Sequence, residues 1–136
     1  SIYYGDEVGL PGKIDPDSRR GFPFSQEWDL EVLDYHKQLI AIRNQYTALR
    51  IGSYEVLFAE GSVYVFARVL RDEEFVVAVN AGNAPARVSF EVKGLQSQCD
   101  RLLYGTAEVT WRVEGDSPLL ELDLLPRQGC ILTGNG

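Results

Sequence analysis

The chain has 136 residues, 45% hydrophobic and 24% charged, which is the balance of a globular protein large enough for one ordinary domain with a proper core. Its formal net charge of -7 argues against a nucleic-acid partner, because a phosphate-binding protein normally carries a basic stripe, and the only dense basic cluster is Arg19-Arg20. No apolar run approaches the roughly 20 residues that cross a bilayer, so we expect no membrane partner.

Residues 1–25 begin the chain. Ile2-Tyr3-Tyr4-Gly5 predicts a buried strand that runs into a turn, and the many Gly, Pro and Asp residues that follow predict a long loop. A loop of this length in a compact protein is usually functional or disordered. Because neither Met nor a signal peptide precedes the strand, we expect the chain to be a fragment of a longer protein.

Residues 26–50 predict one long helix with Ser25 as its N-cap and Gly52 as its stop. Apolar residues recur at alternating steps of four and three and therefore line one face, with Leu33 and Ile40 on its flank. We interpret this stripe as core packing and not as a cofactor site. Its members are Trp28, Val32, Tyr35, Leu39, Ile42, Tyr46 and Leu49.

The remainder, residues 51–136, predicts strands. The runs 62–68 and 74–80 are rich in β-branched and aromatic residues and are separated by the polar turn 71–73, which predicts a hairpin. Short strands at this spacing predict an antiparallel Greek-key β-sandwich, so the fold class is mainly β with one long helix before the sandwich. Further strands are predicted at 54–59, 86–92, 101–104, 107–113, 119–124 and 129–133.

Metal, disulfide and cofactor chemistry have little support in the sequence. Cys99 and Cys130 can pair across neighbouring strands, but the favoured interpretation is two partly buried free thiols. His36 is the single histidine, and no cysteine lies near it, so we expect no zinc site. No metal site and no cofactor are predicted.

The motifs of the first 50 residues, taken together, resemble the end of the catalytic barrel in the α-amylase superfamily. They are Ile2-Tyr-Tyr-Gly-Asp-Glu-Val-Gly9, Asp15-Pro-Asp-Ser-Arg-Arg20, Phe22-Pro23-Phe24, Leu39-Ile-Ala-Ile-Arg43 and Ala48-Leu-Arg50. The resemblance is closest to the neopullulanase, cyclomaltodextrinase and maltogenic amylase branch. It implies that residues 1–50 are a remnant of a (β/α)8 barrel (last strand, loop and last helix) and that residues 51–136 are the C-terminal sandwich domain.

Two departures concern the subfamily. The family usually has Met-Pro-Trp where this chain has Phe22-Pro23-Phe24, and a Pro where this chain has Thr47.

The resemblance also bears on chemistry. A retaining glycosidase needs two carboxyl groups about 5–5.5 Å apart, and in this family they come from barrel strands that would precede Ser1, so no catalytic residue is expected here. The loop after the last strand lies at the rim of a barrel active site. By resemblance, Asp15 and Arg19 bind sugar hydroxyls there, one as acceptor and one as donor. The alternative is a turn-forming ion pair with no ligand.

The predicted function is therefore the non-catalytic C-terminal part of an α-amylase-type glycoside hydrolase that acts on α-glucans (starch, maltooligosaccharides and cyclodextrins), with the sandwich stabilising the barrel. One alternative is a stand-alone α-glucan-binding module with Tyr54, Tyr64, Tyr104 and Trp111 as an aromatic platform; another is a structural or assembly domain. The expected partners are the missing barrel, an α-glucan in that context, and a second copy in a homodimer formed through the exposed barrel-facing surface. The resembling branch suggests a cytoplasmic location.

Overall fold

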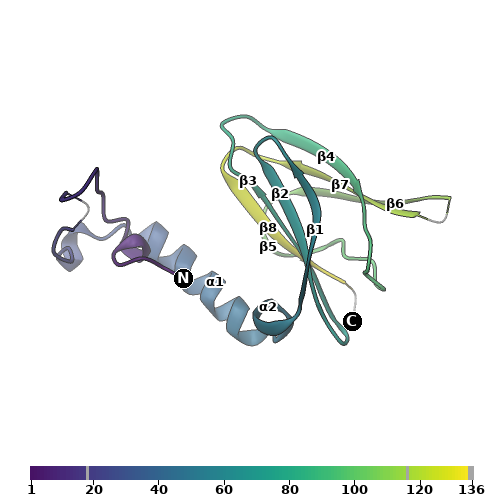
Figure 1. The fold of residues 1–136 in the computed structure, drawn as a ribbon, viewed down its shortest axis with the longest axis horizontal. Coiled ribbons are helices and arrows are strands. Elements are labelled where there is room, and N and C mark those ends of the chain that lie inside the picture. The colour runs from purple at the N-terminus through teal and green to yellow at the C-terminus, as the bar shows by residue number, and fades with distance from the viewer. Residues whose placement is uncertain (18, 116, 135–136) are drawn as a thin grey trace. The chain divides into compact units, whose positions relative to one another are not determined.

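The computed structural model describes residues 1–17, 19–115 and 117–134. The chain divides into two compact units, Ser1–Gln45 and Tyr46–Gly136 (Figure 1). The first unit holds two short 3-10 helices, η1 (Asp6–Val8) and η2 (Ser25–Glu27), and the helix α1 (Leu30–Gln45). The second holds the short helix α2 (Ala48–Ile51) and a β-sandwich.

The helix predicted over 26–50 is wrong at both ends. Asp29, and not Ser25, caps α1: its Oδ1 accepts hydrogen bonds at 3.0 Å from the backbone N–H groups of Glu31 and Val32. At the other end α1 stops at Gln45, and a separate helix, α2, ends at Ile51 with Gly52 as its C-cap.

Contacts within the second unit explain the break between the two helices. The backbone N–H of Ala48 donates to the Glu73 carboxylate at 2.6 Å, and the Tyr46 ring packs on Phe75 with ring centroids 4.9 Å apart. Such tertiary contacts override the small differences in helix propensity on which the prediction depended.

Residues 2–5 do not form the predicted strand. Tyr4 and Gly5 lie in a turn, and Ile2, Tyr3 and Tyr4 are all exposed. A strand needs a neighbour for its backbone N–H and C=O groups. No strand lies among the described residues of Ser1–Gln45, so the segment has nothing in that unit to pair with.

Between residues 53 and 133, the described residues form strands at all eight predicted places, and the predicted two-sheet antiparallel sandwich is confirmed. One sheet has five strands in the order β1-β2-β3-β8-β5, and the other has three in the order β4-β7-β6. The strands are β1 (Ser53–Glu60), β2 (Val63–Leu70), β3 (Glu73–Asn80), β4 (Ala86–Glu91), β5 (Arg101–Gly105), β6 (Glu108–Glu114), β7 (Ser117–Leu124) and β8 (Gln128–Thr133).

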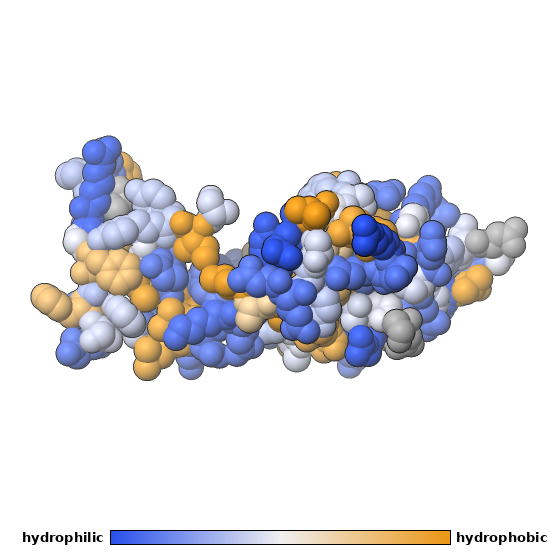
Figure 2. Space-filling model, turned by 90° about the horizontal axis from the view of Figure 1, so that it is seen from below, coloured by the Kyte–Doolittle hydropathy of each residue, from blue (hydrophilic) through white to orange (hydrophobic). Residues whose placement is uncertain are grey.

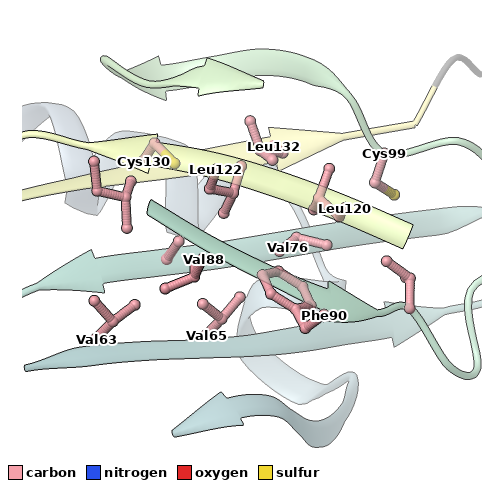
Figure 3. Close-up of a cluster of buried hydrophobic side chains, with 13 residues drawn as sticks. Val63, Val65, Val76, Val88, Phe90, Cys99, Leu120, Leu122, Cys130 and Leu132 are labelled. Atoms are coloured by element: carbon pink, nitrogen blue, oxygen red, sulfur yellow. The ribbon is translucent and has the colours of Figure 1, made fainter. Parts of the chain in front are cut away.

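Alternate residues of both sheets point inward and form one apolar core (Figure 3). Cys99 and Cys130 lie within it, are 0% and 2% exposed, and are free, which confirms the predicted free thiols. Burial raises the pKa of each thiol to about 11, so neither is a reactive thiolate at neutral pH. The other buried members of this core are Val63, Val65, Val76, Ala78, Val88, Phe90, Val92, Leu120, Leu122, Leu124 and Leu132.

Two buried polar side chains, both missed by the sequence reasoning, fix the ends of β3. At one end, Asn80 is fully buried and fully hydrogen-bonded. Its Oδ1 accepts from the Ser62 hydroxyl and from the Gly82 N–H, each at 2.9 Å. Its Nδ2 donates to the carbonyls of Ala84, at 2.9 Å, and Leu125, at 3.2 Å. Asn80 therefore joins the start of β2, the β3–β4 loop and the end of β7.

Glu74 does the same at the other end of β3. Its buried carboxylate accepts hydrogen bonds from the backbone N–H groups of Gln96 and Ser97, at 2.8 and 2.7 Å, and from the Ser97 hydroxyl. Because a buried carboxylate without donors is costly, this side chain holds the segment before β5 in place.

Candidate functional site

The loop between η1 and η2 contains the predicted sugar-binding pair. The structure brings Asp15 and Arg19 together: the Arg19 Nε lies 2.9 Å from the Asp15 Oδ1. The Arg19 side chain is 75% exposed and the Asp15 side chain is 58% exposed. The Arg19 backbone N–H also donates to the Pro16 carbonyl at 2.9 Å. An ion pair this exposed adds little to stability. Both groups remain open to solvent and hence to a ligand.

A second ion pair braces the same loop. The Arg20 guanidinium donates to the Asp17 Oδ1 from Nε at 3.0 Å and from Nη2 at 2.6 Å. The Lys13 backbone N–H donates to the other Asp17 oxygen at 3.1 Å. The Arg20 hydrogen bonds, helped by the Lys13 N–H, hold the pKa of the Asp17 carboxyl below its usual value. Asp17 therefore supports the loop, which leaves Asp15 and Arg19 as its outward-facing pair.

Aromatic rings lie beside this loop. Phe22 packs edge-on against Tyr4, with ring centroids 5.3 Å apart, and against Trp28, at 6.0 Å. The Trp28 Nε1 donates to the Pro23 carbonyl at 3.0 Å, which fixes the ring. Phe24, by contrast, is 78% exposed. A hollow of about 570 Å³ is lined by Leu10, Pro11, Arg20, Phe22, Pro23 and Phe24. An exposed ring beside charged donors and acceptors suits a sugar.

The outer side of the five-stranded sheet is apolar and aromatic. Strand register places six residues on this side. Between β2 and β3, Tyr64 pairs with Val79 and Phe66 pairs with Val77. Between β1 and β2, Val56 pairs with Phe66, and Tyr54 lies diagonally beside Phe66. The rings of Tyr54 and Tyr64 both pack on Phe66, with centroids 5.0 and 5.9 Å away. We call this surface the aromatic face; its members are Tyr54, Val56, Tyr64, Phe66, Val77 and Val79.

Members of the aromatic face remain accessible. Tyr54 is 55% exposed, Val56 48%, Val79 40% and Tyr64 37%. The hydroxyls of Tyr54 and Tyr64 hydrogen-bond to each other, and this bond raises the pKa of Tyr54 above its usual value. The two polar tips therefore satisfy one another, which leaves the rings free to lie against an apolar partner.

The outer side of the three-stranded sheet is charged. The Arg87 guanidinium donates to both Asp123 carboxylate oxygens, at 2.7 and 2.6 Å, which raises the pKa of Arg87 and lowers that of Asp123. Arg112 forms a further ion pair with Glu121 at 3.1 Å. We call this surface the charged face; its members are Arg87, Glu108, Thr110, Arg112, Glu121 and Asp123.

The four residues proposed as a sugar platform do not come together. Tyr54 and Tyr64 meet on β1 and β2, but Trp111 lies on β6 of the other sheet and packs against the core, and Tyr104 lies on β5. Sequence alone did not indicate which strands share a sheet, so the four rings appeared equivalent. A hollow of about 660 Å³ lies at the ends of β4, β5 and β7, beside the start of β6, and has no aromatic ring among its lining residues.

The described residues hold no group of three or more His, Cys, Asp or Glu side chains placed to bind a metal ion. None of the described helices has both the length and the apolar character needed to span a membrane.

Known proteins provide the comparison. The sequence model of the family described as alpha-amylase C-terminal domain matches residues 52–132. Neopullulanase 2 of Thermoactinomyces vulgaris is 32% identical over 136 residues, which cover 96% of this chain and 22% of that protein. An amylopullulanase of Thermoanaerobacter thermohydrosulfuricus is 39% identical over 95 residues, or 62% of this chain and 6% of that protein.

Among solved structures, a debranching enzyme from Nostoc punctiforme superposes with a TM-score of 0.86 and 54% identity. The match covers 98% of this chain and 27% of that enzyme. The chain thus spans less than a quarter of the length of the two curated relatives named above, and little more than a quarter of this enzyme.

Proposed function

The chain belongs to the family of alpha-amylase C-terminal domains, since the family match at 52–132 covers more than half of it, and from this premise we propose that it is the non-catalytic C-terminal part of an enzyme that hydrolyses α-glucans. Its relatives are a neopullulanase, an amylopullulanase and a debranching enzyme. The proposed substrates are starch, maltooligosaccharides and cyclodextrins. The proposed role of the sandwich is to stabilise the catalytic barrel.

One observation carries this proposal. The likeness to the debranching enzyme extends over 98% of this chain, and so over both units, yet it covers only 27% of that enzyme. Hydrolysis of a glycosidic bond by the retaining route needs a nucleophile and a general acid about 5–5.5 Å apart. The part of the enzyme that supplies them is proposed to lie in the remaining polypeptide.

The N-terminal unit supports a barrel origin for residues 1–50. Among the described residues of α1 none is buried, although a helix of this length normally buries an apolar stripe against a neighbour. Leu30, Tyr35 and Ile40 are exposed, as are Tyr3 and Tyr4. Figure 2 shows hydrophobic side chains, in orange, at the surface of this unit at the left of the view.

In the complete enzyme these apolar side chains pack within the barrel, and residues 2–5 pair as its last strand. In the isolated chain they remain uncovered. We therefore expect the isolated chain to form homodimers at high concentration through this surface.

Asp15 and Arg19 contact the α-glucan in the complete enzyme. Their ion pair is exposed, and its loop is braced by Asp17 and Arg20, so the pair can exchange its mutual contact for sugar hydroxyls without refolding the loop. The carboxylate accepts and the guanidinium donates. The exposed Phe24 ring of the same loop offers a stacking surface.

This role is testable by kinetics of the complete enzyme. Asp15→Asn and Arg19→Gln are each expected to raise KM for a maltooligosaccharide about tenfold, the cost of one hydrogen bond to a charged group, with a smaller change in kcat. Asp72→Asn, in the exposed β2–β3 turn, is the matched control and should leave both constants unchanged. An unchanged KM in both loop variants would contradict the role.

A second candidate function has one observation in its favour. Tyr54 and Tyr64 form an exposed aromatic pair, and such a pair can bind a sugar ring without a barrel. Titration of this chain with maltotriose and β-cyclodextrin, followed by heat and by fluorescence, separates the two. Saturable binding would favour the stand-alone α-glucan-binding module. A flat response would favour the C-terminal part whose sugar contacts require the barrel.

We also propose a cytoplasmic location. A relative named intracellular maltogenic amylase from Bacillus subtilis is 35% identical over 92 residues. The two buried cysteines, free although both lie in one core, suit a reducing compartment. Fractionation of the native host with detection of this chain is the direct test, and recovery in the extracellular medium would refute the location.

A further inference from the structure

We propose that the hollow at the ends of β4, β5 and β7 is a binding site for a small organic cation, a molecule with an apolar body and an ammonium head. This inference goes beyond the proposed function, because none of the residues that line the hollow belongs to the Asp15–Arg19 loop or to the aromatic face. The hollow lies where β3 finishes at Asn80, whereas α2 is held at the other end of β3 by Glu73. The entry of the chain into the sandwich unit therefore leaves the hollow open.

The first argument is the size and the apolar lining of the hollow. Its volume of about 660 Å³ lies within the range of small-molecule sites, about 300–1,000 Å³. Alanine, leucine and proline form most of its lining, and two of these residues, Leu102 and Leu125, are 41% and 53% exposed. A ligand that covers them removes apolar surface from water, which is favourable. No aromatic ring is among the lining residues, which argues against a sugar as the ligand.

The second argument is that hydrogen bonds hold the walls of the hollow in place. The buried Asn80 Nδ2 donates to the carbonyls of Ala84 and Leu125, and so ties the segment before β4 to the end of β7. The Thr106 hydroxyl donates to the Gln128 Oε1 at 2.8 Å and ties the β5–β6 connection to β8. A site whose walls are fixed before binding loses little conformational entropy when a ligand enters.

The third argument is the charge of the side chains that line the hollow. Arg87, Asp123 and Glu108 lie next to one another on β4, β7 and β6, in register. Arg87 donates two hydrogen bonds to Asp123, so one carboxylate is left over. Among the described residues, no side chain forms a hydrogen bond or an ion pair with the Glu108 carboxylate. An ammonium head can pair with Glu108, whereas an anionic head would meet a net negative charge.

The test compares three probes that share one apolar body: hexylammonium, hexanol and hexanoate. Each is titrated into this chain at neutral pH and low salt, and binding is followed by the backbone amide NMR signals of residues 102–108 and 123–125. These signals report on the hollow itself and not on other apolar surfaces. We expect hexylammonium to bind saturably, with an affinity at least about tenfold above that of hexanoate and with hexanol in between.

Two variants separate the charge from the apolar lining. Glu108→Gln is expected to weaken hexylammonium binding about fivefold, the upper end for an exposed ion pair, and to leave hexanol binding unchanged. Leu125→Ala shortens a half-exposed side chain and is expected to weaken the binding of all three probes about threefold. Glu114→Gln, the same substitution at the far end of β6, is the matched control and should leave every affinity unchanged.

Three results would overturn the proposal. The first is the absence of saturable shifts with hexylammonium at concentrations that leave the chain folded. The second is equal affinity for the three probes, which would leave an apolar hollow without a preference for a cation. The third is an equal loss of hexylammonium affinity in Glu108→Gln and Glu114→Gln, since the effect would then come from the net charge of the chain and not from the carboxylate at the hollow.

Discussion

The two outer faces of the sandwich are built from strands of the same kind and differ in what they present. The charged face carries two ion pairs within the chain, Arg87 with Asp123 and Arg112 with Glu121. The aromatic face holds tyrosine, phenylalanine and valine, and Tyr54, Val56, Tyr64 and Val79 are accessible to solvent. The charged side chains are neutralised by their own ion pairs, whereas the aromatic face leaves apolar side chains in contact with water. Burial of those side chains against an apolar surface would therefore be favourable.

Both sheets pack on one apolar core, and a substitution in this core is expected to lower the free energy of unfolding more than any other change considered below. Leu122 on β7 is fully buried and lies between Glu121 and Asp123 of the charged face. Leu122→Ala is expected to lower the free energy of unfolding by about 3 kcal/mol through lost burial and a residual cavity. Leu125→Ala, at a 53% exposed leucine just after the strand, is the matched control and should cost far less. Urea titrations of the two variants measure the contrast, and equal losses would contradict the assignment of the core.

A smaller loss of unfolding free energy is expected at Asn80, the last residue of β3. Asn80→Ala removes four partly buried hydrogen bonds, so the free energy of unfolding should fall by about 2 kcal/mol. Asn83→Ala removes only the exposed contact with the Arg127 side chain and serves as the control. Urea unfolding again gives both values. If Asn80→Ala matched its control, the hydrogen bonds of Asn80 would not be what holds the end of β3.

The smallest effect belongs to the charged face. The Arg87 hydrogen bonds lower the pKa of Asp123, so this group stabilises the fold above its unfolded pKa, about 3.9. That stabilisation is lost as the pH falls through the lower folded pKa. Asp123→Asn should therefore reduce stability slightly at pH 7 and lessen the decline in stability of the chain between about pH 4 and pH 2. Urea unfolding of the parent chain and of Asp123→Asn at a series of pH values measures this difference. If the two proteins lost the same unfolding free energy between about pH 4 and pH 2, the Arg87–Asp123 pair would contribute nothing.

The sandwich was largely predictable from sequence because its signals are local. Period-two alternation, as at Val88 and Phe90, and turn residues between the runs place the strands without knowledge of their partners. The cap of α1 was missed because Ser25 and Asp29 are both good caps, and the choice depends on the extended backbone at Trp28.

Long-range features were not predictable in the same way. The buried hydrogen bonds of Asn80 and Glu74 were not predictable, because their partners come from segments far apart in sequence, such as Leu125 and Ser97. The aromatic face required the sheet order: four ring-bearing residues looked alike in the sequence, and pairing of β1 with β2 brings Tyr54 to Tyr64 while β6 carries Trp111 into the core. In the loop, the spacing of Asp15 and Arg19 allowed their ion pair to be anticipated. It did not show that Asp17 binds both Arg20 and the Lys13 backbone and so braces the loop, while Asp15 and Arg19 are the more exposed pair.

The most direct test of the central claim is the thermal inactivation of α-glucan hydrolysis in the complete enzyme with Val79→Ser and Val113→Ser. In the isolated chain both substitutions remove only exposed methyl groups, so both should change its melting temperature little. In the complete enzyme, we predict that Val79→Ser lowers the half-inactivation temperature by about 3 °C, whereas Val113→Ser leaves it unchanged. Equal, negligible shifts for the two variants would show that the aromatic face does not stabilise the catalytic domain.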